Sequence, residues 1–133
     1  MNEDDKNKIL AGSEEYLTFE QGSSVIKRFL KEYGDTPISF FDLLDDGNSI
    51  NVIVGTRSGD QYRGKGYASE IVKEGMNWIE KNKGKLSQEK VVWGVRVDNN
   101  ASIKLAEKSG FKLDKSSYSD DKKWVNYEKK IRR

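Results

Sequence analysis

The stretch between residues 50 and 97 most constrains the fold. Residues 50–54 form an apolar, β-branched run, and residues 91–97 carry apolar side chains at the odd positions, so both predict strands. Residues 66–82 predict a helix between them, with one apolar face made of Ala68, Ile71, Val72, Gly75 and Ile79. Such a strand–helix–strand unit makes a right-handed crossover and leaves its two strands parallel. All-helical and purely antiparallel folds are therefore excluded.

The segments before this unit predict a short strand, a helix and a hairpin. Residues 1–12 are polar and expected to be loose, and residues 16–19 alternate weakly like a strand. Residues 25–33 predict a helix, capped by Ser23 or Ser24 and ended by Gly34, because their apolar side chains fall on one helical stripe. Residues 37–44 and 49–55 predict two antiparallel strands, since the intervening Asp-Asp-Gly-Asn sequence is typical of a turn.

The segments after the unit predict a second helix and two closing strands. The helix begins at Asn99 or Asn100 and ends at Gly110, and the strands lie near residues 111–118 and 123–131. The predicted fold class is α+β (mixed α/β): a mixed, mostly antiparallel sheet with a central parallel strand pair flanked by helices. At 133 residues, the chain is expected to form a single domain over residues 1–133.

Two residue types are missing from the chain, which contains no cysteine and no histidine. This excludes disulfides, a thiolate nucleophile and every Ser-His or Cys-His arrangement. No metal site is expected, because the acidic pairs are typical of solvated turns and no EF-hand loop pattern occurs. No apolar run approaches the roughly 20 residues of a membrane span, and the acidic start does not resemble a signal peptide. We therefore expect a cytoplasmic protein that does not enter a membrane.

Charge is unevenly divided along the chain. Residues 1–60 hold 12 acidic and 6 basic residues, a net charge of −6, whereas residues 61–133 hold 10 and 18, a net charge of +8. A basic half favours a polyanionic ligand, either a phosphorylated cofactor or a nucleic acid, although a lysine-rich soluble surface would look the same. Nucleic acid is disfavoured because Trp78 and Trp93 fall on apolar faces and are assigned to the core.

A glycine-containing loop, Gly64-Lys65-Gly66, joins the first strand of the unit to its helix. The first N–H groups of a helix lack intrahelical partners and the helix dipole is positive there, so this position favours an anion. Glycines let the backbone approach a phosphate closely. The loop lacks the third glycine of the dinucleotide fingerprint and the Gly-Lys-Ser/Thr ending of a P-loop. Alone, it indicates either an anion site or a tight turn.

Two motifs together resemble a known family. Gln61-x-x-Gly64-x-Gly66 resembles the acetyl-coenzyme A signature of the GNAT N-acetyltransferase superfamily, and residues 99–111 resemble the motif that follows the next strand. The second motif is most similar to that of the ribosomal-protein (Rim-type) and small-amine acetyltransferases. The resemblance covers roughly residues 49–130 and implies a GNAT-like fold, an enzyme that uses acetyl-coenzyme A as co-substrate, and no metal.

The resemblance also implies which residues hold the cofactor. Backbone amides of the loop would bind the pyrophosphate, the end of the preceding strand would pair with pantetheine, Asn99 would hydrogen-bond the pantetheine arm and Ser102 would lie near the sulfur. The implied cofactor-binding set is Val54, Gly55, Thr56, Gln61, Tyr62, Arg63, Gly64, Lys65, Gly66, Tyr67, Ala68, Asn99 and Ser102.

The implied reaction is direct attack of a primary amine on the thioester. Many family members place a tyrosine acid where this chain has Ala106, so the acid is sought among Ser102, Tyr118 and Tyr127. The base is sought at Asp42 or Asp98, with a water chain as the alternative. A non-catalytic acyl-coenzyme A-binding or protein-interaction module remains the competing interpretation.

The acceptor side is left open by the sequence. Protein N-termini, polyamines, small amines and antibiotics all remain as acceptors, and the resemblance favours a protein N-terminus or a small amine. The part before the signature strand is short for the family, so it could be abbreviated, completed by a partner chain, or belong to a longer protein. Apolar residues on the closing strands could support a homodimer.

Overall fold

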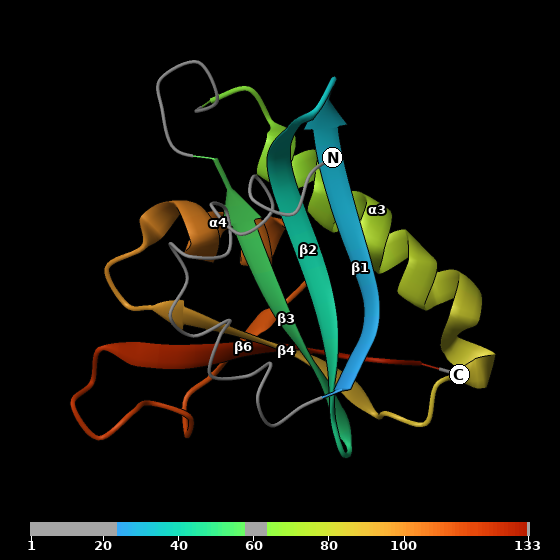
Figure 1. Cartoon of the computed structure of the whole chain (residues 1–133). Helices are drawn as coiled ribbons and strands as arrows, with labels where there is room; N and C mark the ends of the chain where they lie inside the picture. Colours follow the sequence, from blue (N-terminus) through green and yellow to red (C-terminus); the bar gives the residue numbers. More distant parts are fainter. Residues whose placement is uncertain (1–23, 58–63, 133) are drawn as a thin grey trace.

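The computed structural model describes residues 24–57 and 64–132. Within these ranges, six strands form one sheet in the order β1-β2-β3-β4-β6-β5 (Figure 1). The strands are β1 (Ser24–Tyr33), β2 (Thr36–Asp46), β3 (Ser49–Thr56), β4 (Lys90–Arg96), β5 (Lys112–Asp114) and β6 (Trp124–Lys130). The features expected at residues 1–12 and 16–19 lie outside the described residues.

The sheet has the predicted mixed topology. β2 and β3 form the expected antiparallel hairpin, and β3 pairs with β4 in parallel, as the crossover requires. The remaining pairs, β1 with β2, β4 with β6 and β5 with β6, are antiparallel. The α+β fold class is therefore confirmed, with the parallel pair at the centre of the sheet. The first closing strand is much shorter than expected, since β5 spans only three residues.

The predicted helix at residues 25–33 is wrong, because this segment is strand β1. Its register against β2 shifts between Val25 and Lys27 and again between Lys31 and Glu32. The first irregularity places an extra residue, Ile26, in the strand, so Ile26 and Phe29 both pack against the main core although they are three positions apart. A bulged strand thus reproduces the spacing of an amphipathic helix.

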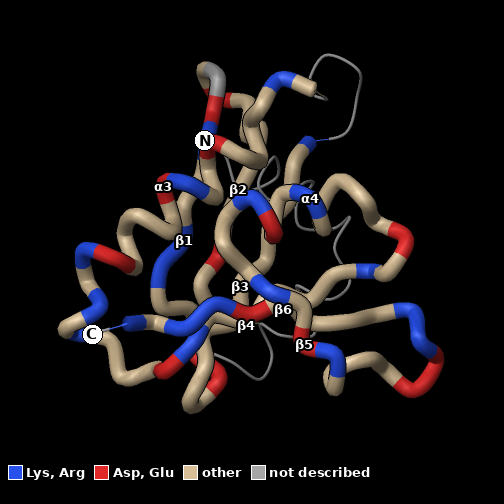
Figure 2. Tube along the Cα trace, turned by 180° about the vertical axis from the view of Figure 1, so that it is seen from behind, with Lys and Arg blue, Asp and Glu red and all other residues tan. Residues whose placement is uncertain are grey.

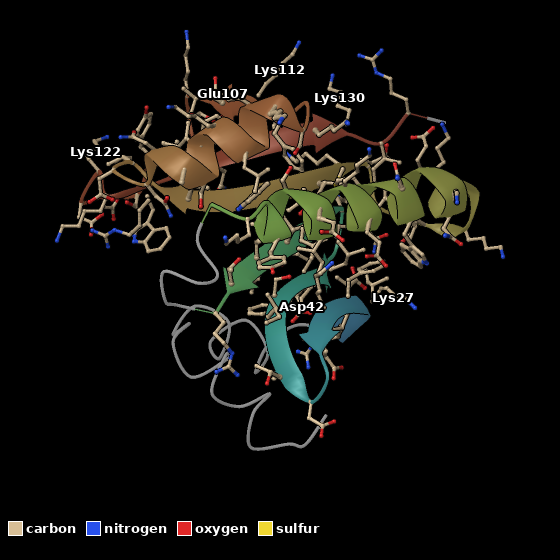
Figure 3. All side chains as sticks on the ribbon, turned by 90° about the horizontal axis from the view of Figure 1, so that it is seen from above. Lys27, Asp42, Glu107, Lys112, Lys122 and Lys130 are labelled. Carbon is tan, nitrogen blue, oxygen red and sulfur yellow. The ribbon has the colours of Figure 1, made fainter. Side chains whose placement is uncertain are left out.

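Both expected helices around the parallel pair are present. α3 (Tyr67–Asn82) follows Gly66, and α4 (Asn100–Lys108) follows Asn99, whose side chain caps it. A short 3-10 turn, η1 (Lys83–Lys85), follows α3. The two helices lie on the same side of strands β1–β3 (Figure 3) and contribute to one core cluster through residues such as Val72 and Ala106. No helix of the described residues covers the opposite face of these strands (Figure 3).

The core contains the tryptophans that were assigned to it. Trp93 is buried on β4 and meets Phe111 edge-on, with ring centroids 5.6 Å apart. Trp78 on α3 is half-buried and packs against the same cluster, where its ring lies 6.3 Å from that of Phe29. Both rings are thus used in packing.

The basic residues of the C-terminal half are interspersed with acidic residues along the chain. Figure 2 shows Lys and Arg along α4, β5, β6 and their connections, with acidic residues between them. Glu107 and Lys112 lie on the outer side of the molecule, away from β1–β3 (Figure 3). Among the described helices, none combines the length and the apolar character that crossing a membrane requires.

Candidate functional site

The central feature of the site is the divergence of β3 and β4. Their parallel pairing covers only Ser49 with Lys90, Ile50 with Val91 and Asn51 with Val92, although the strands continue to Thr56 and Arg96. Figure 1 shows the strands side by side at one end and far apart at the other. From Val52 onward, the edge of β3 that faces β4 therefore has no strand partner among the described residues. An unpaired strand edge can hydrogen-bond an extended ligand as an additional strand would.

A cavity of about 790 Å³ occupies the divergence. Residues of β3, β4 and β6 and the beginning of α4 line it. Its volume lies within the range of small-molecule and cofactor sites. From the predicted cofactor set, the structure brings together Val54, Asn99 and Ser102 around this one cavity. Gly55 and Thr56 continue β3 beyond Val54.

Gly55 has a packing requirement as well. A Cβ atom at this position would lie 2.1 Å from Cε1 of Phe40, a fully buried residue of β2. Any side chain here would have to displace the phenylalanine ring. Gly55 is therefore required by the local fold, independently of any contact with a cofactor.

The beginning of α3 has the geometry of an anion site. Gly64 and Gly66 adopt left-handed φ angles of 69° and 78°, and a Cβ atom on either would meet nothing within 4 Å. Gly66 is the N-cap and, as a glycine, supplies no capping side chain; the backbone N–H of Glu70 donates to Gly66 O at 2.9 Å. The helix start lies at the same end of the molecule as the end of β3 (Figure 1). The first-turn amides of an uncapped helix attract negative charge.

Not every predicted loop residue can be placed. Gly64, Lys65 and Gly66 are exposed, and Tyr67 and Ala68 begin α3 and are half-buried. Gln61, Tyr62 and Arg63 lie outside the described residues.

Asn99 has a structural partner. Its side-chain oxygen accepts a hydrogen bond from the backbone N–H of Ser102 at 3.2 Å, which caps α4. Both residues also line the cavity, so the capped turn forms part of its wall. A side chain that caps a helix and borders a cavity can serve both purposes.

Asp42, a predicted base, lies buried on β2 beside β1 (Figure 3). Its two carboxylate oxygens accept hydrogen bonds from Nε and an Nη of Arg28, each at 2.9 Å. Asp98, the other predicted base, is exposed and its carboxylate lies 3.3 Å from Nε of Arg96. Neither aspartate lines the cavity. The carboxylate that does line it, Asp46, lies at the closed end near Ser49.

The two tyrosines proposed as acids also lie away from the cavity lining. Tyr118 is 40% exposed on the loop between β5 and β6. Tyr127 packs in the core on the helix side of β6, where burial raises its pKa above the usual 10.0 and the nearby Glu107 and Tyr118 raise it further. Ala106 is fully buried in the same core. Among the proposed acids, Ser102 alone borders the cavity.

Several cavity residues were not identified from the sequence. Asn51, Gly94, Arg96, Trp124 and Asn126 all line it. Strand alternation could have identified those on β4 and β6. Trp93, Val95, Val125 and Tyr127 pack in the core, so the residues next to them along each strand point to the opposite face of the sheet. Among the described residues, no group of three or more acidic residues is placed to hold a metal ion.

Comparison with protein families gives one match, over residues 13–112, to the model described as an acetyltransferase (GNAT) domain. No curated protein matches the chain. Solved structures share its fold at low identity. The ribosomal-protein-S18-alanine N-acetyltransferase of Escherichia coli is 15% identical with a TM-score of 0.66, over 89% of this chain and 77% of the other.

Two further structures were determined with ligands. A Bacillus subtilis acetyltransferase in complex with CoA is 15% identical with a TM-score of 0.67, over 99% of this chain and 94% of the other. A putative acetyltransferase from Salmonella typhimurium, with its cofactor acetyl-CoA, is 14% identical with a TM-score of 0.62, over 96% and 74% of the two chains. At these identities, the likeness concerns the fold.

Proposed function

The chain belongs to the GNAT family of acetyltransferases, and on that premise we propose that it binds acetyl-coenzyme A between β3 and β4 and transfers the acetyl group to a primary amine. The observation that carries this proposal is the divergence of the two strands after Asn51 and Val92, with a cavity in the gap. Two structures of the same fold contain CoA or acetyl-CoA, which supports this cofactor.

The cofactor's pyrophosphate would lie at the start of α3. Gly64 and Gly66 leave open space there, and the first helix amides can donate to phosphate oxygens. Lys65 adds positive charge beside them. In the proposed set, Gln61, Tyr62 and Arg63 precede these glycines, and Tyr67 and Ala68 begin the helix. A glycine N-cap leaves space for a phosphate because it carries no side chain.

The pantetheine arm would extend along β3. Its amides would pair with the backbone of Val54, Gly55 and Thr56, whose edge on the β4 side has no strand partner in the described part of the chain. Asn99 and Ser102 border the same space from the start of α4. The pantetheine arm would thus run from the start of α3 into the cavity.

In the proposed reaction, the lone pair of a neutral amine attacks the thioester carbonyl carbon. A backbone N–H of β3 would stabilise the negative charge that develops on the carbonyl oxygen. The C–S bond then breaks, the nitrogen loses a proton, and the coenzyme A thiolate leaves and gains one. Ser102 is the proposed donor to the sulfur because it is the candidate hydroxyl that borders the cavity. Because Asp42 and Asp98 lie outside the lining, water is the proposed carrier of the amine proton.

Glycine variants test the cofactor site. Gly66→Glu puts a side chain on a residue whose backbone is in the left-handed region, which strains the loop. It also puts a negative charge where the pyrophosphate should bind. We expect calorimetry to show at least about a hundredfold weaker coenzyme A binding, and a similar loss for Gly64→Asp. Gly34→Glu is the matched control, since Gly34 also has a positive φ and open surroundings but lies in the β1–β2 turn. Equal affinity in the Gly66 variant and the control would overturn the proposed site.

A non-catalytic acyl-coenzyme A-binding module is the second candidate. The observation that favours it is Ala106, buried where many family members carry a tyrosine acid. Incubation with acetyl-coenzyme A and a panel of amines, peptides and aminoglycosides, with detection of free thiol, separates the two functions. Thiol release that depends on an amine supports the transferase, whereas tight binding without release for every amine supports the module.

A further inference from the structure

A row of side chains covers the face of β4 and β6 that points away from the helices. The paired residues along this row are Arg96 with Trp124, Gly94 with Asn126 and Val92 with Glu128. Their neighbours Trp93, Val95, Val125 and Tyr127 are buried in the core, so the row lies on the opposite face of the sheet. Trp93 and Val95 also border the cavity, which extends between the diverging strands. Five of the six residues in the row line the cavity, and Glu128 does not.

Gly94 leaves room in this row for the amide of Asn126. A Cβ atom on Gly94 would lie 3.3 Å from Oδ1 of Asn126, so the amide oxygen lies directly over the glycine. Gly94 is exposed and Asn126 half-buried, and both line the cavity. The Asn126 oxygen is therefore a hydrogen-bond acceptor that a molecule in the cavity can reach.

The backbone at Asn126 is held in place from the opposite edge of β6. Its N–H donates to Oγ of Ser117 at 2.8 Å, and that hydroxyl donates to the carbonyl oxygen of Asp114 at 2.6 Å. The pairing of Asp114 with Asn126 joins the same residues through β5. A side chain on a backbone fixed this way is suited to positioning a ligand.

Asn126 lies on a different strand from those between which the cofactor is proposed to bind. If acetyl-coenzyme A binds as proposed, it lies between β3 and β4 and reaches the helix side at the start of α3. β6 lies beyond β4, on the side away from β3. Asn126 is then about one strand spacing, roughly 5 Å, from the cofactor's strand gap. Under the proposed function, a molecule that meets the thioester from this side would be the acceptor amine.

Arg96 places a positive charge next to Gly94 and Asn126. β3 and β4 remain paired up to Val92, so the open part of the cavity begins at Trp93 and extends toward Arg96. The other lining cation, Lys90, lies in the closed part with Glu128 at 3.0 Å. Arg96 lies over the Trp124 ring at 5.5 Å, and its contact with the exposed Asp98 is of the weak surface kind that a substrate anion can replace.

We infer that Gly94 and Asn126 form the acceptor subsite, with Arg96 beside it, and that the acceptor is a primary amine with an anionic group close to the amine. The Asn126 amide oxygen accepts an N–H of the amine and directs its lone pair toward the thioester. Arg96 binds the anionic group. Polycationic amines are disfavoured, because the open part of the cavity presents no carboxylate among its described lining residues.

Bisubstrate conjugates test this inference without a known acceptor. The first probe is coenzyme A joined through an S-acetyl linker to the N-terminus of the peptide Ala-Glu-Glu-Ala, and the second carries Ala-Lys-Lys-Ala. Calorimetry compares each with coenzyme A alone. We expect the acidic conjugate to bind about tenfold more tightly than coenzyme A and than the basic conjugate.

Variants assign the gain in affinity to the subsite. Asn126→Ala should reduce the extra affinity of the acidic conjugate about fivefold, and Gly94→Ala should reduce it by pushing the amide oxygen away. Arg96→Gln should make the two conjugates bind equally. Affinity for coenzyme A itself should stay the same in all three. The matched controls are Asn77→Ala, Gly84→Ala and Arg132→Gln, which change exposed residues outside the cavity.

The possible failures are distinguishable. If coenzyme A does not bind the wild-type protein, the proposed function fails. If it binds but neither conjugate binds more tightly, or the basic conjugate binds more tightly than the acidic one, the acceptor subsite is wrong. Unchanged discrimination in Arg96→Gln, or unchanged affinity in Asn126→Ala, overturns the role of that residue.

Discussion

Helix α3 crosses strand β2 at Gly75, where a Cβ atom would lie 1.9 Å from Cδ1 of Phe41. Both residues are buried, and Phe41 is fully so. The contact fixes the distance between the helix and the sheet at the third turn of α3. The position of Gly66 and the first-turn amides relative to β3 therefore depends on a glycine that contacts no ligand.

Gly75→Ala should destabilise the protein. Alanine favours a helix over glycine by about 1 kcal/mol, but the added methyl group overlaps the Phe41 ring, and overpacking of a core costs typically about 1–3 kcal/mol. We expect a lower melting temperature in calorimetry. Gly84→Ala, where the methyl group meets nothing within 4 Å, is the control. A Gly75→Ala protein that melts above the wild type would show that the contact relaxes without cost.

The Arg28–Asp42 pair should stabilise the fold rather than supply the catalytic base. Asp42 is fully buried, and breaking a buried ion pair by removing one of its members costs about 3 kcal/mol or more. Arg28→Met should lower the urea midpoint strongly, whereas Lys83→Met, which breaks the exposed pair with Glu80, should change it little. Asp42→Asn should lose stability and retain acetyl transfer at low temperature. A stable Asp42→Asn protein without activity would restore Asp42 as the base.

Tyr127 should make stability depend on pH in the alkaline range. Burial, with Glu107 and Tyr118 nearby, raises its folded-state pKa above 10.0, so the folded protein holds the phenol proton more tightly than the unfolded chain does. Its contribution to stability is present in full below about pH 10 and is lost as the pH rises through the folded-state pKa. Ultraviolet titration should show a tyrosine that ionises above pH 10, absent from Tyr127→Phe. An unchanged titration curve in that variant would contradict this assignment.

Asn99 should combine helix capping with cofactor binding, and two substitutions separate these roles. Asn99→Ala removes the cap and should cost about 1 kcal/mol of stability, whereas Asn99→Ser keeps a capping oxygen with a shorter side chain. We expect both variants to bind coenzyme A more weakly and only the alanine variant to melt earlier. If Asn99→Ser binds coenzyme A as the wild type does, the residue is a cap alone.

The sequence predicted the centre of the fold well. The parallel strands, the crossover helix and the capped second helix followed from apolar periodicity and from Gly66 and Asn99, because these signals are local. β1 could not be recognised, since its bulge places Ile26 and Phe29 on one face at helical spacing. Whether this segment forms a helix or a bulged strand depends on its pairing with β2, and the spacing of apolar residues carries no information about that pairing.

The site was predicted less completely than the fold. The glycine loop and Asn99 stood out because turn and cap chemistry demands particular residue types. The divergence of β3 and β4 after Asn51 and Val92 cannot be predicted from the sequence pattern of either strand, since both continue as regular strands. Asn126 and Arg96 become cavity residues only through that divergence. The burial of Asp42 by Arg28 is likewise a contact across strands.

A crystal structure of the protein with acetyl-coenzyme A tests the central claim most directly. The account predicts the pyrophosphate at the backbone amides of Gly64–Ala68, pantetheine along the free edge of β3 from Val54 to Thr56, and the thioester in the cavity beside Asn99 and Ser102. Density for the cofactor elsewhere on the molecule, with the gap between β3 and β4 unoccupied, would contradict it.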